Sequence, residues 1–364
     1  MQRARLSRDR HTFFIIPFFI ALGRDRPQYL VAEINGVPTV VTLLSTNIIM
    51  HPYADETDLP AIAHLINACE AFDKVDSSTS VDALRQEFAH PDLDTARNVC
   101  LWRKNDGTLV GLSALAISRS TETSSGCLNF HVHPGSRGTS IETQMVTWGE
   151  QQLRAVGEKS GRPLQLQAVS RVRQGDRPVL LERHGFIADR YFVQMSRSLA
   201  EPIPMPEFPA GFALRYIEGD HEAADWVAMF NETFIDHGNH HPMTVEQFSY
   251  GKDPAYNPTL DLIAIAPDRT FAAFCNASCR EDNRRSGRNK GTITLLGTRR
   301  GFRKQGLGRA MLLSGLQRLK AIGAETALLR VDSDNPFGAS RLYTSVGFSK
   351  LHTTVVYTKE VRHR

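Results

Sequence analysis

An internal repeat most limits what this chain can fold into, because it requires two copies of one structural unit. Tyr53 opens an amphipathic helix in the first half, and Tyr216 opens a similar helix 163 residues later. A Gly-Phe pair that starts at Gly185 recurs 162 residues later at Gly347. Nearly equal offsets at the start and at the end of the unit indicate a duplicated domain rather than chance matches.

A proline-rich segment separates the two copies. Four of the eight residues from Pro202 to Pro209 are prolines. Proline donates no backbone hydrogen bond and does not fit a helix interior or a central strand, so the segment is predicted to be a linker. We expect an N-terminal extension over residues 1–49, a first domain over 50–198, the linker over 199–210 and a second domain over 211–364.

Both copies combine strand and helix patterns in the same order. In the first copy, strand patterns over residues 99–102 and 109–117 flank an Asn-Asp-Gly turn, which is typical of a hairpin. A strand, a helix and a strand follow, over residues 127–132, 143–156 and 164–169. The second copy repeats this order and ends in a strand pattern over 355–358. The patterns predict an α/β fold of the α+β kind, with a mixed sheet in each of two tandem domains.

The second copy carries a motif that indicates an anion site. A strand pattern over Thr292–Thr298 and a helix pattern over Ala310–Ile322 flank Arg303, Gly306 and Gly308, which have the spacing R-x-x-G-x-G. Such a turn presents backbone N–H groups at a helix N-terminus, where the helix dipole favours negative charge. Glycine lets a phosphate approach the backbone closely. The motif therefore predicts a cradle for a diphosphate.

Other nucleotide motifs do not fit this cradle. Three residues after Gly308 the chain has Met311 and not glycine, so the dinucleotide fingerprint is incomplete. No Lys-Ser or Lys-Thr pair follows the glycines, so a Walker A loop does not fit either. Downstream come Asn335, Tyr343 and the Gly-Phe pair at Gly347. This combination over residues 290–350 resembles the GNAT superfamily of N-acetyltransferases.

The resemblance implies an enzyme that uses acetyl-CoA as co-substrate and acetylates an amine by direct attack in a ternary complex. It places the general acid, which protonates the leaving thiolate, at Tyr343. Tyr343 also shares a helix face with Leu342 and Val346, which is compatible with a core tyrosine. Asn335 also fits an N-cap before Pro336. The residues that the resemblance assigns to cofactor binding are Leu296, Gly297, Thr298, Arg303, Lys304, Gln305, Gly306, Gly308, Arg309 and Asn335.

The first copy lacks these chemical groups. When Arg137 is aligned with Arg303, Ser140 and Glu142 stand in place of the two cradle glycines, and a carboxylate there would repel a diphosphate. The counterpart of Tyr343 is Leu181. This organisation resembles tandem members of the superfamily such as mycothiol synthase, in which the C-terminal copy is catalytic. We expect the first copy to support the second and to form one wall of its acceptor groove.

The general base is not visible in the sequence. Many GNAT members use a glutamate on the strand before the cradle, but Thr292–Thr298 contains no carboxylate. A loop after the first helix of the second copy supplies other candidates, namely Glu232, Asp236, His237, His240 and His241. We interpret this histidine-containing loop as a polar loop and not as a metal site.

Charge and cysteine content favour a cytoplasmic protein, and the resemblance implies a small-molecule or peptide amine as its acceptor. The net charge of +4 over 364 residues does not indicate nucleic acid, and we expect no membrane partner. The cysteine count of five is odd, which suits reduced thiols. The basic start before the apolar run Phe13–Leu22 resembles a signal peptide, and the alternative is an over-extended start with Met50 as the true first residue.

Two other functions stay open at this point. The intact cradle and Tyr343 favour an enzyme, whereas the missing base is compatible with a non-catalytic acetyl-CoA-binding or scaffold protein. A longer acyl-CoA or an aminoacyl donor on the same fold is the other alternative, and the size of the pocket beyond Leu296 would decide it. The sequence does not indicate an oligomeric state.

Overall fold

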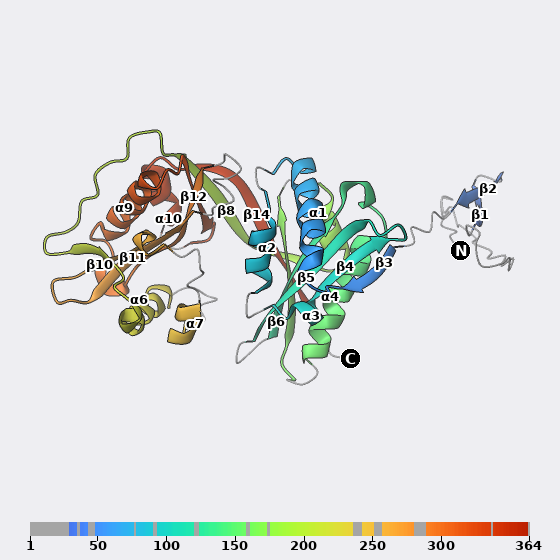
Figure 1. The fold of residues 1–364 in the computed structure, drawn as a ribbon, viewed down its shortest axis with the longest axis horizontal. Coiled ribbons are helices and arrows are strands. Elements are labelled where there is room, and N and C mark those ends of the chain that lie inside the picture. The colour runs from blue at the N-terminus through green and yellow to red at the C-terminus, as the bar shows by residue number, and fades with distance from the viewer. Residues whose placement is uncertain are drawn as a thin grey trace, which may run out of the picture.

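The computed structural model describes residues 29–34, 37–42, 48–75, 78–89, 93–119, 124–157, 161–172, 175–235, 242–250, 257–279, 289–335 and 338–362. Within these residues, one 12-stranded mixed sheet has the strand order β3-β4-β5-β6-β7-β14-β8-β13-β12-β11-β10-β9. Figure 1 shows strands of both halves of the chain joined through β8 and β14. A separate hairpin near the N-terminus consists of β1 (Tyr29–Ile34) and β2 (Val37–Thr42). The apolar run at Phe13–Leu22 lies outside the described residues.

The first half of the chain builds one lobe of this sheet. Its strands are β3 (Ile48–Pro52), β4 (Val99–Lys104), β5 (Leu109–Arg119), β6 (Ser124–Val132) and β7 (Leu164–Arg171). Its helices are α1 (Leu59–Phe72), α2 (Val81–Phe88), α3 (Thr95–Asn98), α4 (Ile141–Gly157) and α5 (Arg177–Arg183). The β3 strand starts at Ile48, so the sheet takes in two residues before Met50.

The second half builds the other lobe with the same order of elements. Its strands are β9 (Ala213–Tyr216), β10 (Asp261–Ile265), β11 (Phe271–Ser278), β12 (Lys290–Thr298) and β13 (Thr326–Asp332). Its helices are α6 (Ala223–Phe234), α7 (Val245–Tyr250), α9 (Leu307–Ala321) and α10 (Ala339–Ser345). Residues 199–212, between the lobes, form neither helix nor strand. The mixed α/β fold with tandem units is confirmed.

The last strand of each half crosses to the other half. The strand β8 (Ile187–Ser198) ends the first half but pairs antiparallel with β13 of the second. The strand β14 (Ser349–Val361) ends the second half but pairs antiparallel with β7 of the first. The two crossing strands also pair with each other, and they join the two lobes in Figure 1. We call this arrangement the strand exchange.

Helices cover both faces of the sheet in the second lobe. Leu312, Leu316 and Leu319 of α9 are fully buried on one face, as the helix periodicity predicts. Gly315 lets α9 approach closely, because a Cβ there would lie 2.6 Å from Cys275 Sγ on β11. On the other face Trp226 of α6 packs against aromatic rings that include Phe274. All five cysteines are free.

Candidate functional site

The predicted cradle forms between the end of β12 and the start of α9. Gly306 is the residue just before α9 and has a φ of 88°, a left-handed conformation that glycine adopts without strain. Lys304 is also left-handed, with a φ of 63°. No side chain among the described residues caps α9. The N–H groups of the first turn therefore face outward from the helix end, which is the arrangement that binds anions.

Gly297 at the end of β12 and Gly308 of the motif have different roles in this geometry. At Gly297 a Cβ would lie 2.5 Å from Phe274 Cζ and 2.6 Å from Thr233 Cγ2, so packing between β12 and α6 requires glycine. At Gly308 a Cβ would meet Thr298 Oγ1 at 3.5 Å and Leu342 Cδ2 at 3.7 Å, which are ordinary contacts. Packing therefore tolerates a small side chain at Gly308. A longer side chain at this position would extend over the cradle.

Arg303 of the motif and Arg309, the residue after the motif, both donate hydrogen bonds to other parts of the protein. Arg303 donates from Nε to the Thr298 carbonyl at 3.2 Å and from Nη2 to the Thr233 carbonyl at 2.8 Å. Arg309 donates to Ser345 Oγ on α10 at 2.7 Å. These contacts tie the cradle to β12, α6 and α10. Lys304 and Gln305 are exposed at its rim.

The parallel ladder between β12 and β13 ends before the strands do. Its last pair is Ile293 with Leu329, after which β12 continues along β11 and β13 continues along β8. Beyond this pair the facing backbone groups of the two strands do not pair with each other. We call this diverging region, residues 294–298 and 330–332, the C-terminal splay. Leu296 lies in it and is half-buried.

Tyr343 lies in α10 and is 9% exposed. Its ring packs edge-on against Phe348, with 6.2 Å between centroids. Burial, and in second place the nearby Cys275, raise the pKa of Tyr343 to about 12. The phenol is therefore protonated at neutral pH, which is the state that a general acid needs.

Asn335 lies between β13 and α10, where its N–H donates to the Asp332 carbonyl at 3.2 Å. The predicted N-cap role for Asn335 is wrong, because α10 starts later, at Ala339. Gly338 precedes the helix with a φ of 68°, so a left-handed glycine sets the direction in which α10 begins.

The candidate bases are mostly outside the described residues. Asp236, His237, His240 and His241 fall there. Glu232 is described, and both of its carboxylate oxygens accept from Arg299, at 2.5 and 2.6 Å. These hydrogen bonds hold the pKa of Glu232 below its usual range, which makes it a weaker base. In the described part of the chain no three His, Cys, Asp or Glu side chains gather as a metal site would need.

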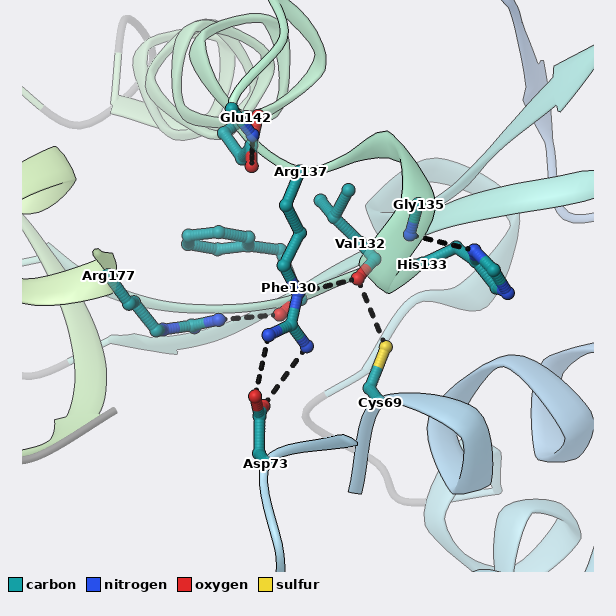
Figure 2. Close-up of polar contacts among 10 residues, drawn as sticks. Cys69, Asp73, Phe130, Val132, His133, Gly135, Arg137, Glu142 and Arg177 are labelled. Atoms are coloured by element: carbon teal, nitrogen blue, oxygen red, sulfur yellow. Dashed lines mark hydrogen bonds and ion pairs between the residues drawn. The ribbon is translucent and has the colours of Figure 1, made fainter. Parts of the chain in front are cut away.

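The first half contains a similar turn, and in this half a glutamate side chain of the protein binds to it. Arg137 donates from Nε to the Val132 carbonyl at 3.1 Å, as Arg303 does to Thr298, and its Nη atoms donate to Asp73 (Figure 2). The next residue, Gly138, is left-handed with a φ of 73°. Its N–H donates to Glu142 Oε1 at 2.9 Å, so a carboxylate of the protein binds this turn.

Comparisons with known proteins agree with this geometry. A family model described as "Acetyltransferase (GNAT) family" matches residues 223–348. A mycothiol acetyltransferase of Kineococcus radiotolerans is 33% identical over 72% of this chain and 82% of its own length. This chain belongs to the GNAT acetyltransferase family.

Further matches extend over both halves. A mycothiol acetyltransferase of Thermobispora bispora is 30% identical over 63% of this chain and 74% of its own length. A GCN5-related N-acetyltransferase from Sphaerobacter thermophilus matches 88% of this chain and 97% of its own, with a TM-score of 0.74 and 25% identity. A tandem GNAT protein from the clavulanic acid pathway has a TM-score of 0.67 at 17% identity, over 87% of this chain and 99% of its own.

Membership settles the class of reaction. GNAT enzymes use acetyl-CoA as the acetyl donor, so the predicted cofactor and the predicted acetyltransferase activity are confirmed. Among the helices of the described residues, none combines the length and the apolar character needed to cross a membrane. The assignments of Tyr343 and of the individual cofactor contacts remain predictions.

Proposed function

We propose that this GNAT acetyltransferase uses its C-terminal half to transfer the acetyl group of acetyl-CoA directly to the amine of a small molecule. The observation that carries the proposal is the pairing of the uncapped start of α9 with the C-terminal splay. The N–H groups at Lys304 to Gly308 would receive the diphosphate. The backbone of β12 beyond Ile293 would receive the amide-bearing arm of the cofactor and direct it towards the acceptor.

Tyr343 is the proposed general acid. A neutral amine forms a bond with the thioester carbonyl carbon, the carbon–sulfur bond breaks, and the sulfur takes the phenolic proton of Tyr343. The amine loses its own proton to a base. Two features support the role: the phenol of Tyr343 is protonated at neutral pH, and its neighbour Leu342 lies near the cradle, with Cδ2 3.7 Å from where a Cβ of Gly308 would be.

As acceptor we propose the unacetylated precursor of mycothiol. The support is the name of two relatives, mycothiol acetyltransferase, which are 33% and 30% identical to this chain. The N-terminal half would form one wall of the acceptor groove, because β8 of that half lies directly beside β13 of the other. Because its cofactor is made inside cells, we place the enzyme in the cytoplasm.

The test is incubation of the full chain with acetyl-CoA and the purified precursor, read by mass spectrometry of the products. We expect the precursor to gain one acetyl group, and a mixture of other small amines to gain less. The matched control is Gly308→Glu, which copies the first half's carboxylate into the cradle and should abolish both binding and turnover. Acetylation of another amine in preference to the precursor would overturn the acceptor and leave the reaction class in place.

The alternative is a non-catalytic acetyl-CoA-binding protein. It is favoured by one observation, that β12 (Lys290–Thr298) carries no carboxylate to act as a base. In that case calorimetry would show tight binding of acetyl-CoA that depends on Gly308, while no amine in the panel would be acetylated.

A further inference from the structure

Each half contains an asparagine whose side-chain amide binds both backbone groups of a later residue. In the second half, Asn231 Nδ2 donates to the Met243 carbonyl at 3.0 Å, and Asn231 Oδ1 accepts from the Met243 N–H at 2.8 Å. In the first half, Asn67 makes the same two hydrogen bonds with Thr79, at 2.9 and 2.8 Å. The partners are 12 residues apart in both halves. We call each of these pairs an amide clamp.

The residue after each clamped residue caps the next helix. Ser80 is the N-cap of α2, and its side chain accepts from the Ala83 N–H. In the second half, Thr244 Oγ1 accepts from the Gln247 N–H near the start of α7. Each amide clamp therefore sets where the following helix begins, because it holds the residue directly before the cap.

In the second half, the helix that carries the amide clamp is also fixed to the cradle. Asn231 lies in the last turn of α6, and the two residues that follow it bind the region after β12. The carboxylate of Glu232 accepts from Arg299, and the carbonyl of Thr233 accepts from Arg303 at 2.8 Å. The position of α7 relative to the cradle therefore depends on the last turn of α6 and on its amide clamp.

The helix α7 lies beside α6 on the face of the sheet opposite α9 (Figure 1). Phe248 of α7 stacks on Trp226 of α6, with 4.5 Å between ring centroids. Leu295 in the C-terminal splay packs against the apolar cluster that contains these two rings. The next residue, Leu296, packs against the cluster of the other face, which contains Tyr343. The C-terminal splay is therefore flanked by α6 and α7 on one face and by α9 and α10 on the other.

This division leaves one face of the splay to the acceptor. The cradle at the start of α9 and the proposed acid Tyr343 lie on the same face, so acetyl-CoA would enter the splay from there. An amine that attacks the thioester directly needs an approach that the cofactor does not fill, and the face of α6 and α7 offers it. Its rate of attack depends on how firmly that face orients it.

We propose that Asn231 is a positioning residue for the acceptor amine, because its amide clamp holds α7 in place as a wall of the acceptor site. The inference rests on the proposed transfer in the C-terminal half. Asn231 touches no reacting atom and acts through the placement of α7. Asn67 holds α2 in the same way, but in the half where Leu181 stands in place of Tyr343, so its amide clamp should serve the fold alone.

The experiment compares Asn231→Ala with Asn67→Ala in the full chain, because each variant loses the same two hydrogen bonds. Thermal unfolding should show a similar fall in Tm for both. Asn231→Ala should raise the KM for the mycothiol precursor by about ten-fold or more, since a displaced wall no longer orients the amine. Its affinity for acetyl-CoA, measured by calorimetry, should stay that of the native chain. Asn67→Ala should change neither quantity.

The difference between the two variants decides the role of Asn231. An equal rise of KM in both folded variants would assign both amide clamps to general stability and overturn the proposal. If Asn231→Ala does not fold, Thr244→Ala replaces it, because it removes an exposed cap of α7 and leaves α6 intact. That variant should also raise the KM for the precursor at unchanged acetyl-CoA affinity, and an unchanged KM would overturn the proposal.

Failure of this inference can be told apart from failure of the proposed function. If the native chain acetylates another amine in preference to the precursor, the same KM comparison is made with that amine. A KM that a folded Asn231→Ala variant leaves unchanged, in an active enzyme, would overturn the role of Asn231 alone. A native chain that acetylates no amine would contradict the proposed function and this inference with it.

Discussion

At the scale of single residues, the site shows how one position can serve packing and chemistry together. Tyr343 is in the core beside Phe348, so its burial by itself would suit a structural tyrosine. The same burial raises its pKa to about 12 and keeps the phenol protonated. The contributions of Tyr343 to the reaction rate and to the stability of the fold can be separated by substitution with phenylalanine, which keeps the ring and removes the hydroxyl.

Tyr343→Phe should therefore keep the affinity for acetyl-CoA and lower kcat by about a hundred-fold or more, as the loss of a positioned general acid does. Calorimetry and steady-state kinetics measure the two quantities. A turnover number that equals that of the native enzyme at saturating amine would assign Tyr343 to packing.

The pH dependence follows from the raised pKa of Tyr343. Because the protonated form is the active one, and its pKa of about 12 lies above the usual value of about 10, Tyr343 should cause no loss of rate between about pH 6 and 10. A loss of rate with an apparent pKa near 10, present in the native enzyme and absent in Tyr343→Phe, would contradict the assignment.

The two equivalent arginines should differ in their contribution to stability. Arg303→Ala removes two hydrogen bonds to carbonyls, at a cost of about 1–3 kcal/mol. Arg137→Ala also leaves the largely buried carboxylate of Asp73 without its bidentate partner, at a cost of about 3–5 kcal/mol. Urea unfolding of both variants compares them, and equal costs would show that the Asp73 pair adds nothing.

At the scale of elements, the sequence predicts the order of strands and helices well and their pairing poorly. The cradle and the helix after it follow from glycine spacing and apolar periodicity, and both are present with a helix start three residues before the expected one. The duplicated offsets correctly indicate two similar lobes. The N-cap expected at Asn335 is wrong because α10 begins at Ala339, directly after the left-handed Gly338.

Two features of the structure could not be predicted from the sequence. Arg177 donates hydrogen bonds to carbonyls of two neighbouring strands, β6 and β7, at the point where the strands diverge. The sequence shows an arginine where the second copy has Ala339, but it does not show where the two strands separate. The strand exchange leaves no mark on hydrophobic alternation, because β8 and β14 have apolar positions that suit either neighbour. The register of β8 and β14 and the strands with which they pair are decided by tertiary packing.

The edge strand β3 gives an element-scale prediction for the N-terminus. A chain that starts at Met50 loses Ile48 and Ile49, two of the five residues that pair with β4. Since β3 is at the edge of the sheet, we expect this chain to fold and to acetylate normally, with a loss of stability under about 2 kcal/mol relative to a start at residue 43. Thermal unfolding of the two chains measures the difference, and failure of the shorter chain to fold would show that the edge is essential.

At the scale of the whole molecule, the two lobes are tied by three ladders and not by the linker. β8 pairs with β13, β14 pairs with β7, and β8 pairs with β14. Residues 199–212, which include the predicted linker over 199–210, form no strand that joins the sheet. The N-terminal half is therefore part of the framework that positions β13 beside the proposed site.

Cutting the chain in the linker should leave the molecule whole. With a protease site inserted at Pro204, we expect the two cleaved halves to elute together in size-exclusion chromatography and to retain acetyltransferase activity. Residues 199–364 expressed by themselves should be poorly soluble or inactive, because β13 and β14 lose the strand between them. Separation of the cleaved halves under native conditions would show that the ladders are weaker than the covalent link.

The strand exchange also sets the order of events during protein synthesis. One of the two neighbours of β7 is β14 (residues 349–361), which is translated after every other strand of the 12-stranded sheet. The N-terminal lobe is translated first, but one edge of β7 has no partner strand until the second lobe has also been made. Nascent chains that stop before β14 therefore expose an open sheet edge, which favours aggregation.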